Sequence, residues 1–334
     1  MKGVVPKHGA SAKIEKARTL TDILTITLNP AVDLATSVEQ VVAGPKLYCK
    51  APRVDPGGGG VNVARAICRL GGIAKALVAV GGASGDRLLN LLSAEAVPVH
   101  PVAVSGETRE SFAVTDEVSG AQYRFSLPGQ SLTREDGDRL LAEIAAEVSG
   151  DSYVVLSGGV APGLGDAFPD RVLAAIAPRT DRLIVDTSKG ALDHLIRQPS
   201  APVHLLRLDQ REAEQSAGKP LPTPADSIAF AEALIARGVA RTIVSGRQAE
   251  GSILVTSGRR YICRTPQVPV ISKIGAGDAF VGALTFSLAQ GDAPGVALQW
   301  GVASATATMS THGTDFCTRD IVAGLRSQCH LEEV

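Results

Sequence analysis

The sequence has few aromatic residues, no excess of charge of one sign and no long apolar run. Phe, Trp and Tyr make up 4% of its 334 residues, which disfavours a platform for stacking single-stranded nucleic-acid bases. Lys and Arg number 33 against 34 Asp and Glu, so no global field attracts nucleic acid or anionic lipid. No run approaches the roughly 18 apolar residues that span a bilayer. We therefore expect neither nucleic acid nor membrane among its partners.

Cysteine is also scarce, and its spacing excludes two common roles. The five cysteines are an odd number, and none forms a Cys-x-x-Cys pair. A disulfide framework or a structural zinc site is therefore not expected, and reduced thiols in a cytoplasmic protein are the simpler interpretation. The cysteines are Cys49, Cys68, Cys263, Cys317 and Cys329.

Composition and length predict one large globular domain with short flanks. Apolar residues make up 45% and charged residues 20%, which excludes wholesale disorder. Residues 1–21 are basic and small and lack the apolar stretch of a signal peptide, so we expect a disordered extension there. The domain is predicted over residues 22–324, and residues 325–334 are expected to form a tail.

Helical and strand patterns alternate along most of this domain. From residue 134 onward, helices are predicted at 134–148, 170–177, 189–196 and 225–237, and strands at 153–159, 182–186, 202–209 and 241–245. This alternation favours successive βαβ units. The predicted fold class is α/β, a doubly wound and mostly parallel sheet with helices on both faces.

One stretch follows a different period. Phe112 and Val114, then Tyr123 and Phe125 after a polar turn, alternate with polar residues, which predicts an antiparallel hairpin. We expect a small antiparallel β lid built from about 38–54 and 100–127.

The usual phosphate-binding motifs are missing. The only Gly-Lys pair, at Gly218, is followed by proline, so there is no P-loop. The run Gly57–Gly60 has Asn62 where a dinucleotide-binding motif needs glycine.

A second glycine-rich segment is the stronger candidate for chemistry. Gly275, Ala276 and Gly277 precede Asp278 and an apolar helical stretch. Free N–H groups at such a helix start can bind an anion, and their field favours an ionised carboxylate. Asp278 could then accept a proton from an alcohol beside a phosphate that is being transferred. The alternative is that Asp278 only caps the helix.

Short polar side chains near the N-terminal glycines form a third candidate. Asp33 and Asn62 could hydrogen-bond sugar hydroxyls, with Gly58 and Gly59 leaving room for the ring. The alternatives are turn chemistry for Asp33 and a helix cap for Asn62.

Taken together, these segments resemble a known family. DPGGGGVNVARAICRLGG and ISKIGAGDAFVGAL are similar to the two signatures of PfkB-type sugar kinases, in the ribokinase superfamily. The resemblance runs from about residue 23 to 324. Its closest likeness is to the 6-phosphofructokinase branch, through TLNPAVDLAT, GPKLYCKAP, QYRFSLPG and HGTDFC. The tagatose-6-phosphate and 1-phosphofructokinase branch usually has a lysine in the glycine tetrad, and none occurs here.

The resemblance implies ATP-dependent phosphorylation of a ketohexose phosphate, with fructose 6-phosphate as the leading acceptor. It makes Asp278 the base, with Gly275, Ala276 and Gly277 donating amides to the γ-phosphoryl group. It implies Mg²⁺ with ATP, leaves K⁺ as a further candidate, and implies a homodimer. The sugar phosphate would contact Asp33, Gly58, Gly59, Asn62, Lys46, Arg109 and Arg124. The nucleotide would contact Arg207, Asp209, Ser245, Gly246 and Gly313, with Glu212 and Asp209 serving the metal through water.

Each cation has an ordinary alternative role. Lys46 could be a solvated lysine, and Arg109 and Arg124 could protect a sheet edge. Asp209 stands where the family has asparagine, and it either serves the metal or pairs with a neighbouring arginine at the surface. Tyr48 replaces an arginine that relatives carry.

Three functions remain open at this point. The first is a fructose-6-phosphate kinase. The second is a kinase of tagatose 6-phosphate, fructose 1-phosphate, an unphosphorylated sugar or a nucleoside. The third is a catalytically weak sensor of sugar phosphate or nucleotide.

Overall fold

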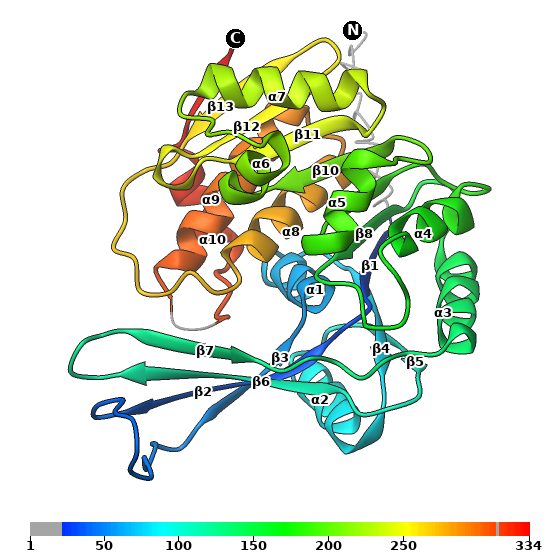
Figure 1. Cartoon of the computed structure of the whole chain (residues 1–334). Coiled ribbons are helices and arrows are strands. Elements are labelled where there is room, and N and C mark those ends of the chain that lie inside the picture. Colours follow the sequence, from blue (N-terminus) through cyan, green and yellow to red (C-terminus); the bar gives the residue numbers. More distant parts are fainter. Residues whose placement is uncertain (1–21, 312–313) are drawn as a thin grey trace, which may run out of the picture.

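A large twisted sheet forms the centre of the protein, for which the computed structural model describes residues 22–311 and 314–334 (Figure 1). Its strands are β1 (Ile23–Thr27), β4 (Lys75–Val80), β5 (Val99–Ala103), β8 (Tyr153–Ser157), β9 (Leu183–Asp186), β10 (Val203–Leu208), β11 (Ala240–Gly246), β12 (Ser252–Thr256), β13 (Arg260–Arg264) and β14 (His330–Glu333). They lie in the order β14-β13-β12-β11-β10-β9-β8-β1-β4-β5. Pairing is parallel from β5 to β11 and antiparallel from β11 to β14. The predicted α/β class is confirmed.

Helices cover both faces of this sheet. One face carries α3 (Arg134–Glu147), α4 (Phe168–Ile176), α5 (Lys189–Arg197), α6 (Gln210–Ala217) and α7 (Pro224–Ala236). The other carries α1 (Gly59–Arg69), α2 (Gly82–Ala94), α8 (Ala276–Ala289), α9 (Pro294–Met309) and α10 (Arg319–Arg326). A short 3₁₀ turn, η1 (Gln248–Glu250), follows β11.

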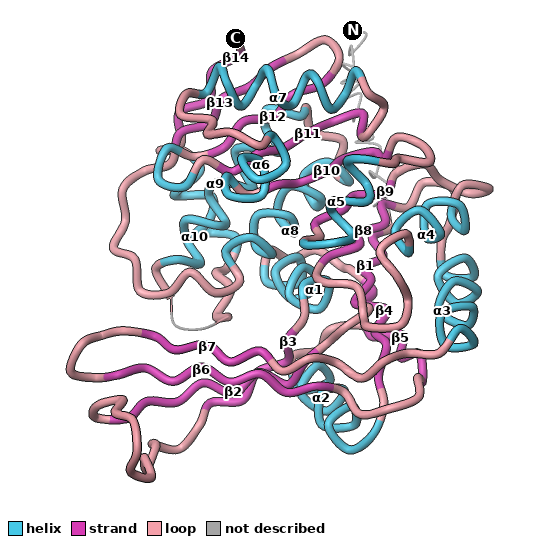
Figure 2. Tube along the Cα trace, in the orientation of Figure 1, coloured by secondary structure: helices cyan, strands magenta, loops and turns pink. Residues whose placement is uncertain are grey.

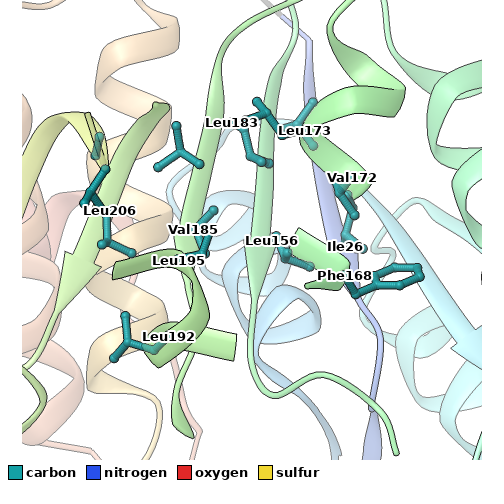
Figure 3. Packing of buried hydrophobic residues seen from close by; sticks show 14 of the residues in the cluster. Ile26, Leu156, Phe168, Val172, Leu173, Leu183, Val185, Leu192, Leu195 and Leu206 are labelled. Carbon is teal, nitrogen blue, oxygen red and sulfur yellow. The ribbon is translucent and has the colours of Figure 1, made fainter. Parts of the chain in front are cut away.

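The strands feed two separate apolar cores by alternation. In β9, Leu183 and Val185 join the core under α4 and α5, whereas Ile184 joins the core under α1 and α8. Successive side chains of a strand point to opposite faces, so a strand buried on both sides must be apolar throughout. Figure 3 shows Leu183, Val185 and the fully buried Phe168 among the residues of the first core.

A second, smaller sheet projects from the body as the lid (Figures 1 and 2). Its strands are β2 (Ala31–Val38), β3 (Arg53–Gly57), β6 (Arg109–Asp116) and β7 (Gln122–Ser126), in the order β3-β2-β6-β7. The hairpin is confirmed, because Phe112 faces Phe125 and Val114 faces Tyr123 across antiparallel β6 and β7. β2 and β3 are also antiparallel, and β2 joins β6 in parallel.

Two predicted boundaries are wrong. The lid strands expected within residues 38–54 lie at 31–38 and 53–57, because Gly44, Pro45 and Pro52 break the chain between them into a loop. Residues 100–103, expected in the lid, belong to strand β5 (Val99–Ala103) of the large sheet. The expected tail is also structured, since β14 pairs with β13 and Cys329 is buried beside it. A strand of four residues is too short to show a period in the sequence.

The start of α1 is packed too closely to carry side chains. A Cβ on Gly60 would contact the Ile26 carbonyl and lie 2.6 Å from Thr27 Oγ1, and one on Gly59 would lie 2.5 Å from Ser157 Oγ. Gly58 has φ +114°, which disfavours any side chain. The glycine run therefore lets α1 approach the ends of β1 and β8. In the part of the chain that is described, no helix is long and apolar enough to cross a membrane.

Replacing Gly60 with alanine should lower the free energy of unfolding by about 1–3 kcal/mol, because the added methyl group overpacks the contact with β1. Gly324→Ala is the matched control, since Gly324 lies inside α10 and a methyl group there would meet no atom within 4 Å. It should stabilise the protein by roughly 0.5–1 kcal/mol. Denaturant unfolding of both variants measures this. Equal effects of the two substitutions would contradict the packing argument.

Candidate active site

A cavity of about 250 Å³ lies between the lid and the start of α8. It collects residues from β2, β3, β6 and β7 of the lid, from the start of α1 and from the Gly275 loop. Segments far apart in the sequence therefore meet at one place. Of the residues singled out from the sequence, this cavity is lined by Asp33, Gly58, Gly59, Asn62, Arg109, Arg124, Gly275 and Asp278.

The start of α8 brings unpaired amides to the cavity. Gly275 precedes the helix with φ +75°, which a residue with a side chain rarely adopts. The first helical bond runs from the Ala279 N–H to the Gly275 carbonyl, 2.8 Å away. The amides of Ala276, Gly277 and Asp278 therefore precede the hydrogen-bonded ladder, where a helix binds anions.

Asp278 does not cap this helix, contrary to one of the two interpretations. It is the third residue of α8, and no side chain caps the helix. Its Oδ2 instead accepts a hydrogen bond of 2.9 Å from Asn62 Nδ2. Asn62 lies inside α1, whose N-cap is Gly58, so the cap interpretation is wrong for Asn62 as well.

Burial opposes the helix field at Asp278. Burial, followed by the nearby charge of Asp186, raises the pKa of Asp278 from its ordinary 3.8 to about 7. The bond from Asn62 and the charge of Arg207 oppose this rise without overcoming it. The helix field favours the ionised form, as predicted, but desolvation of the carboxylate outweighs it and sets the direction of the shift.

Two lid arginines face a second acid in the cavity. Burial raises the pKa of Asp33 to about 6, against the lowering effect of Arg109 and Arg124. Arg109 donates to Ser111 Oγ and Ser126 Oγ, both at 2.9 Å, which ties its guanidinium to the hairpin. β6 is an inner strand of the lid, so edge protection does not explain Arg109. Arg124 is exposed on the edge strand β7.

Lys46 is not brought to this cavity. It is exposed in the loop between β2 and β3, near the exposed Tyr48, and does not line the cavity. Its role as a phosphate ligand stays a prediction.

A charged cluster adjoins the start of α8 at the carboxyl ends of β9 and β10. Arg207 Nη1 lies 3.2 Å from Asp186 Oδ1, and a Cβ on Gly277 would lie 3.3 Å from the same guanidinium. Burial lowers the pKa of Arg207, but the charges of Asp186 and Glu212 more than compensate, and the net pKa is raised.

Asp209 has a structural task that its sequence context does not reveal. Its Oδ1 accepts from the Glu212 N–H at 2.7 Å, and Glu212 Oε2 accepts from the Asp209 N–H at 2.8 Å. This reciprocal pair caps α6. The predicted surface pairing of Asp209 with Arg207 or Arg211 is not found among the ion pairs of the described residues, where Arg207 pairs with Asp186. Burial, with the charges of Asp209 and Asp186, raises the pKa of Glu212.

Ser245 and Gly246 end β11 beside this cluster. Ser245 is 2% exposed, and a Cβ on Gly246 would lie 3.9 Å from the Asp209 Cα. Gly313 lies outside the described residues.

Sequence reasoning missed Asp186 and Arg65. Asp186 is the last residue of the buried strand β9, and its position at the carboxyl end of a parallel strand was the available signal. Arg65 carries no such signal, since it reads as an ordinary residue of an amphipathic helix.

A doubly wound sheet with a helix start and a lid around one polar cavity is the arrangement of an α/β enzyme that acts on anionic substrates. The model of the pfkB family carbohydrate kinases matches residues 22–321. The chain belongs to this family.

Characterised relatives lie close to it. The ATP-dependent 6-phosphofructokinase isozyme 2 of Mycobacterium tuberculosis is 38% identical over 300 residues, which cover 90% of this chain and 87% of the relative. The phosphofructokinase-2 of Escherichia coli has been solved in complex with potassium, with a TM-score of 0.87 and 34% identity, and with fructose-6-phosphate, with a TM-score of 0.85 and 33% identity. Both alignments cover 92% of this chain and 99% of the solved chain.

The raised pKa of Asp278 predicts a stability effect that does not depend on function. A folded carboxyl that holds its proton up to about pH 7 destabilises the folded state as pH rises from about 4 to 7. Asp278→Asn should therefore stabilise the protein more at pH 8 than at pH 5, by roughly 1–2 kcal/mol. Denaturant unfolding at the two pH values measures it, with Asp193→Asn, exposed on α5, as control. The same gain at both pH values would refute the assigned charge state.

Proposed function

We propose that the protein transfers the γ-phosphoryl group of ATP to the 1-hydroxyl of fructose 6-phosphate. The carrying observation is the polar cavity that Asp278, at the start of α8, lines together with two lid arginines. In the proposed step the sugar oxygen forms a bond to the γ-phosphorus, the bond from that phosphorus to the β,γ-bridging oxygen breaks, and the hydroxyl proton passes to Asp278. The products are fructose 1,6-bisphosphate and ADP.

Asp278 is the proposed general base. A base works best when its pKa lies near the working pH, and burial brings the pKa of Asp278 to about 7. The hydrogen bond from Asn62 leaves its second carboxylate oxygen available to the sugar hydroxyl.

The amides of Ala276, Gly277 and Asp278 are proposed to bind the transferring phosphoryl group. Phosphoryl transfer depends on positioning and charge neutralisation more than on covalent chemistry by the protein. Amides fixed at a helix start supply this without moving.

The lid is proposed to hold the acceptor. Arg109 and Arg124 would bind its phosphate, because a dianion suits paired guanidinium groups. Asp33, Gly58, Gly59 and Asn62 would contact the sugar. Lys46 would have to reach this phosphate from its exposed loop between β2 and β3.

The charged cluster beside α8 is proposed to serve the nucleotide and Mg²⁺. The carboxylates Asp186, Asp209 and Glu212 outnumber Arg207, and the raised pKa of Glu212 is what a buried acid shows before a cation arrives. Bound Mg²⁺ would neutralise charge on the phosphates. In the described residues no group of three His, Cys, Asp or Glu side chains is arranged to hold a metal directly, which favours contact through water. K⁺ remains a further cation candidate, supported by the potassium complex of the Escherichia coli relative.

A homodimer through the lid is part of the proposal. Phe112 and Phe125 stack with ring centroids 5.2 Å apart, yet are 40% and 47% exposed, and Leu127 beside them is 47% exposed. An apolar face of this kind marks an interaction surface. The cytoplasmic location expected from the cysteines stays a prediction.

A panel of acceptors separates this function from its alternatives. ADP release should be fastest with fructose 6-phosphate, compared with tagatose 6-phosphate, fructose 1-phosphate, free fructose and a nucleoside. Asp278→Asn keeps a carbonyl oxygen that can accept the hydrogen bond from Asn62. It should lower kcat by roughly 10²–10⁴-fold, because the general base is lost. Faster turnover of fructose 1-phosphate would move the protein to the other branch. Binding without ADP release would make it a sensor.

The lid arginines should determine the preference for a phosphorylated acceptor. Arg109→Ala should raise KM for fructose 6-phosphate at least about tenfold and change KM for ATP little, because the lost charge lies on the lid, where the acceptor phosphate is proposed to bind. Arg87→Ala is the control, since Arg87 lies 3.8 Å from Glu110 and outside the cavity lining. Equal activity of the unmodified enzyme on fructose and fructose 6-phosphate would count against the assignment.

A further inference from the structure

Arg65 is hydrogen-bonded to Asn62, which in turn donates to Asp278, the proposed base. It lies on α1, one turn after Asn62, and is only 3% exposed. A buried guanidinium is costly unless its N–H groups are paired. One of its hydrogen-bond partners lies in the site: Arg65 Nη1 donates to Asn62 Oδ1 at 3.1 Å.

Four other partners fix the guanidinium. Its Nε and Nη2 donate to the two carboxylate oxygens of Glu95, at 2.8 and 2.7 Å. Nη1 also donates to the Pro56 carbonyl at 3.2 Å and to Thr314 Oγ1 at 3.0 Å. The ring of Phe316 lies 5.2 Å from the guanidinium carbon. These contacts leave Arg65 one position.

The position of Arg65 decides which way the Asn62 amide faces. An asparagine amide can turn over and exchange its oxygen and nitrogen. With a guanidinium on one side and a carboxylate on the other, only one orientation pairs donors with acceptors. The oxygen must face Arg65, and the NH₂ group must then face Asp278, 2.9 Å away.

We propose that Arg65 is a positioning residue for phosphoryl transfer, which acts by holding the Asn62 amide in the orientation that donates to Asp278. The proposal rests on the proposed function for its catalytic readout. Without Arg65 the amide can present its oxygen to Asp278, which repels the carboxylate and leaves its orientation free. Asp278 is also faced by Asp186 from β9, Arg207 from β10 and Asp33 from β2, and none of these replaces the Asn62 bond.

The same residue secures the loop behind Gly275. A Cβ on Gly275 would lie 3.2 Å from Phe316 and 3.4 Å from Thr314 Cγ2, so both residues held by Arg65 pack against the turn that starts α8. Arg65 thereby restrains Asp278 from two sides, through Asn62 and through the turn that precedes it.

A double-mutant cycle on kcat tests the proposal, with whichever acceptor the unmodified enzyme phosphorylates. Arg65→Met should lower kcat about tenfold or more, since hydrogen bonds to charged groups are stronger than those between neutral groups. Once Asn62 is alanine, Arg65→Met should lower kcat less than about threefold further, because the route through Asn62 is already lost. Full additivity of the two substitutions would overturn the proposal.

Two further variants separate positioning from stability. Arg65→Lys keeps a cation opposite Glu95 but cannot donate to Glu95 and Asn62 together, so it should unfold near the parent temperature and still lose most of the rate. Arg69→Met, exposed on the same helix, should keep the parent rate. Parent activity in a folded Arg65→Lys would contradict the proposal.

The pH dependence gives an independent readout. The Asn62 bond lowers the pKa of Asp278, so Arg65→Met should move the acid limb of kcat to higher pH by about half a unit or more. The stability gain of Asp278→Asn at pH 8 should also be larger in the Arg65→Met background, and this measurement needs no turnover. An unchanged limb and an unchanged gain would leave Arg65 a structural residue only. If the unmodified protein releases no ADP with any acceptor, the proposed function fails while this stability test still decides the role of Arg65.

Discussion

The hydrogen bond from Asn62 to Asp278 joins the two glycine-rich segments of the chain, and the site depends on it. Asn62 lies on α1 and Asp278 on α8, two helices that pack on the same face of the large sheet. Gly58 to Gly60 let α1 approach β1 and β8 without clashes, and Gly275 turns the chain into α8. The glycines therefore place the backbone, and the amide–carboxylate bond sets the side chains.

The charged side chains of the site are arranged so that charged ligands would balance them. Two acids have pKa values that burial raises: Asp33, on lid strand β2, to about 6, and Asp278, on α8, to about 7. The cations Arg109 and Arg124 lie on the lid with Asp33, and Arg207 lies at the end of β10 beside Asp186. In the proposed function the strand-end cluster serves the metal–nucleotide complex and the lid arginines serve the acceptor phosphate, so both substrates would meet at Asp278.

The sequence predicted those features of the structure that local residue patterns control. Alternation in β6 and β7, apolar strands with two buried faces, and the glycine-rich helix starts were all visible in it, and the structure confirms them. The bounds of the lid strands and the short strand β14 were not, because strand pairing depends on partners distant in the sequence. The raised pKa of Asp278 was not visible in the sequence, because a helix start is a local pattern, whereas burial depends on the folded chain.

Arg65 shows why part of a site is invisible in a single sequence. Its neighbours in the chain predict a helix face, whereas its partners come from four places: Asn62 on its own helix, Pro56 in β3, Glu95 after α2 and Thr314 before α10. Only the folded chain brings these together. A buried cation needs all of its partners. A change in any of the four segments would therefore shift Arg65 and, with it, the Asn62 amide that donates to Asp278. Asp278 is therefore held by the packing of α1 against its surroundings as much as by α8, on which it lies.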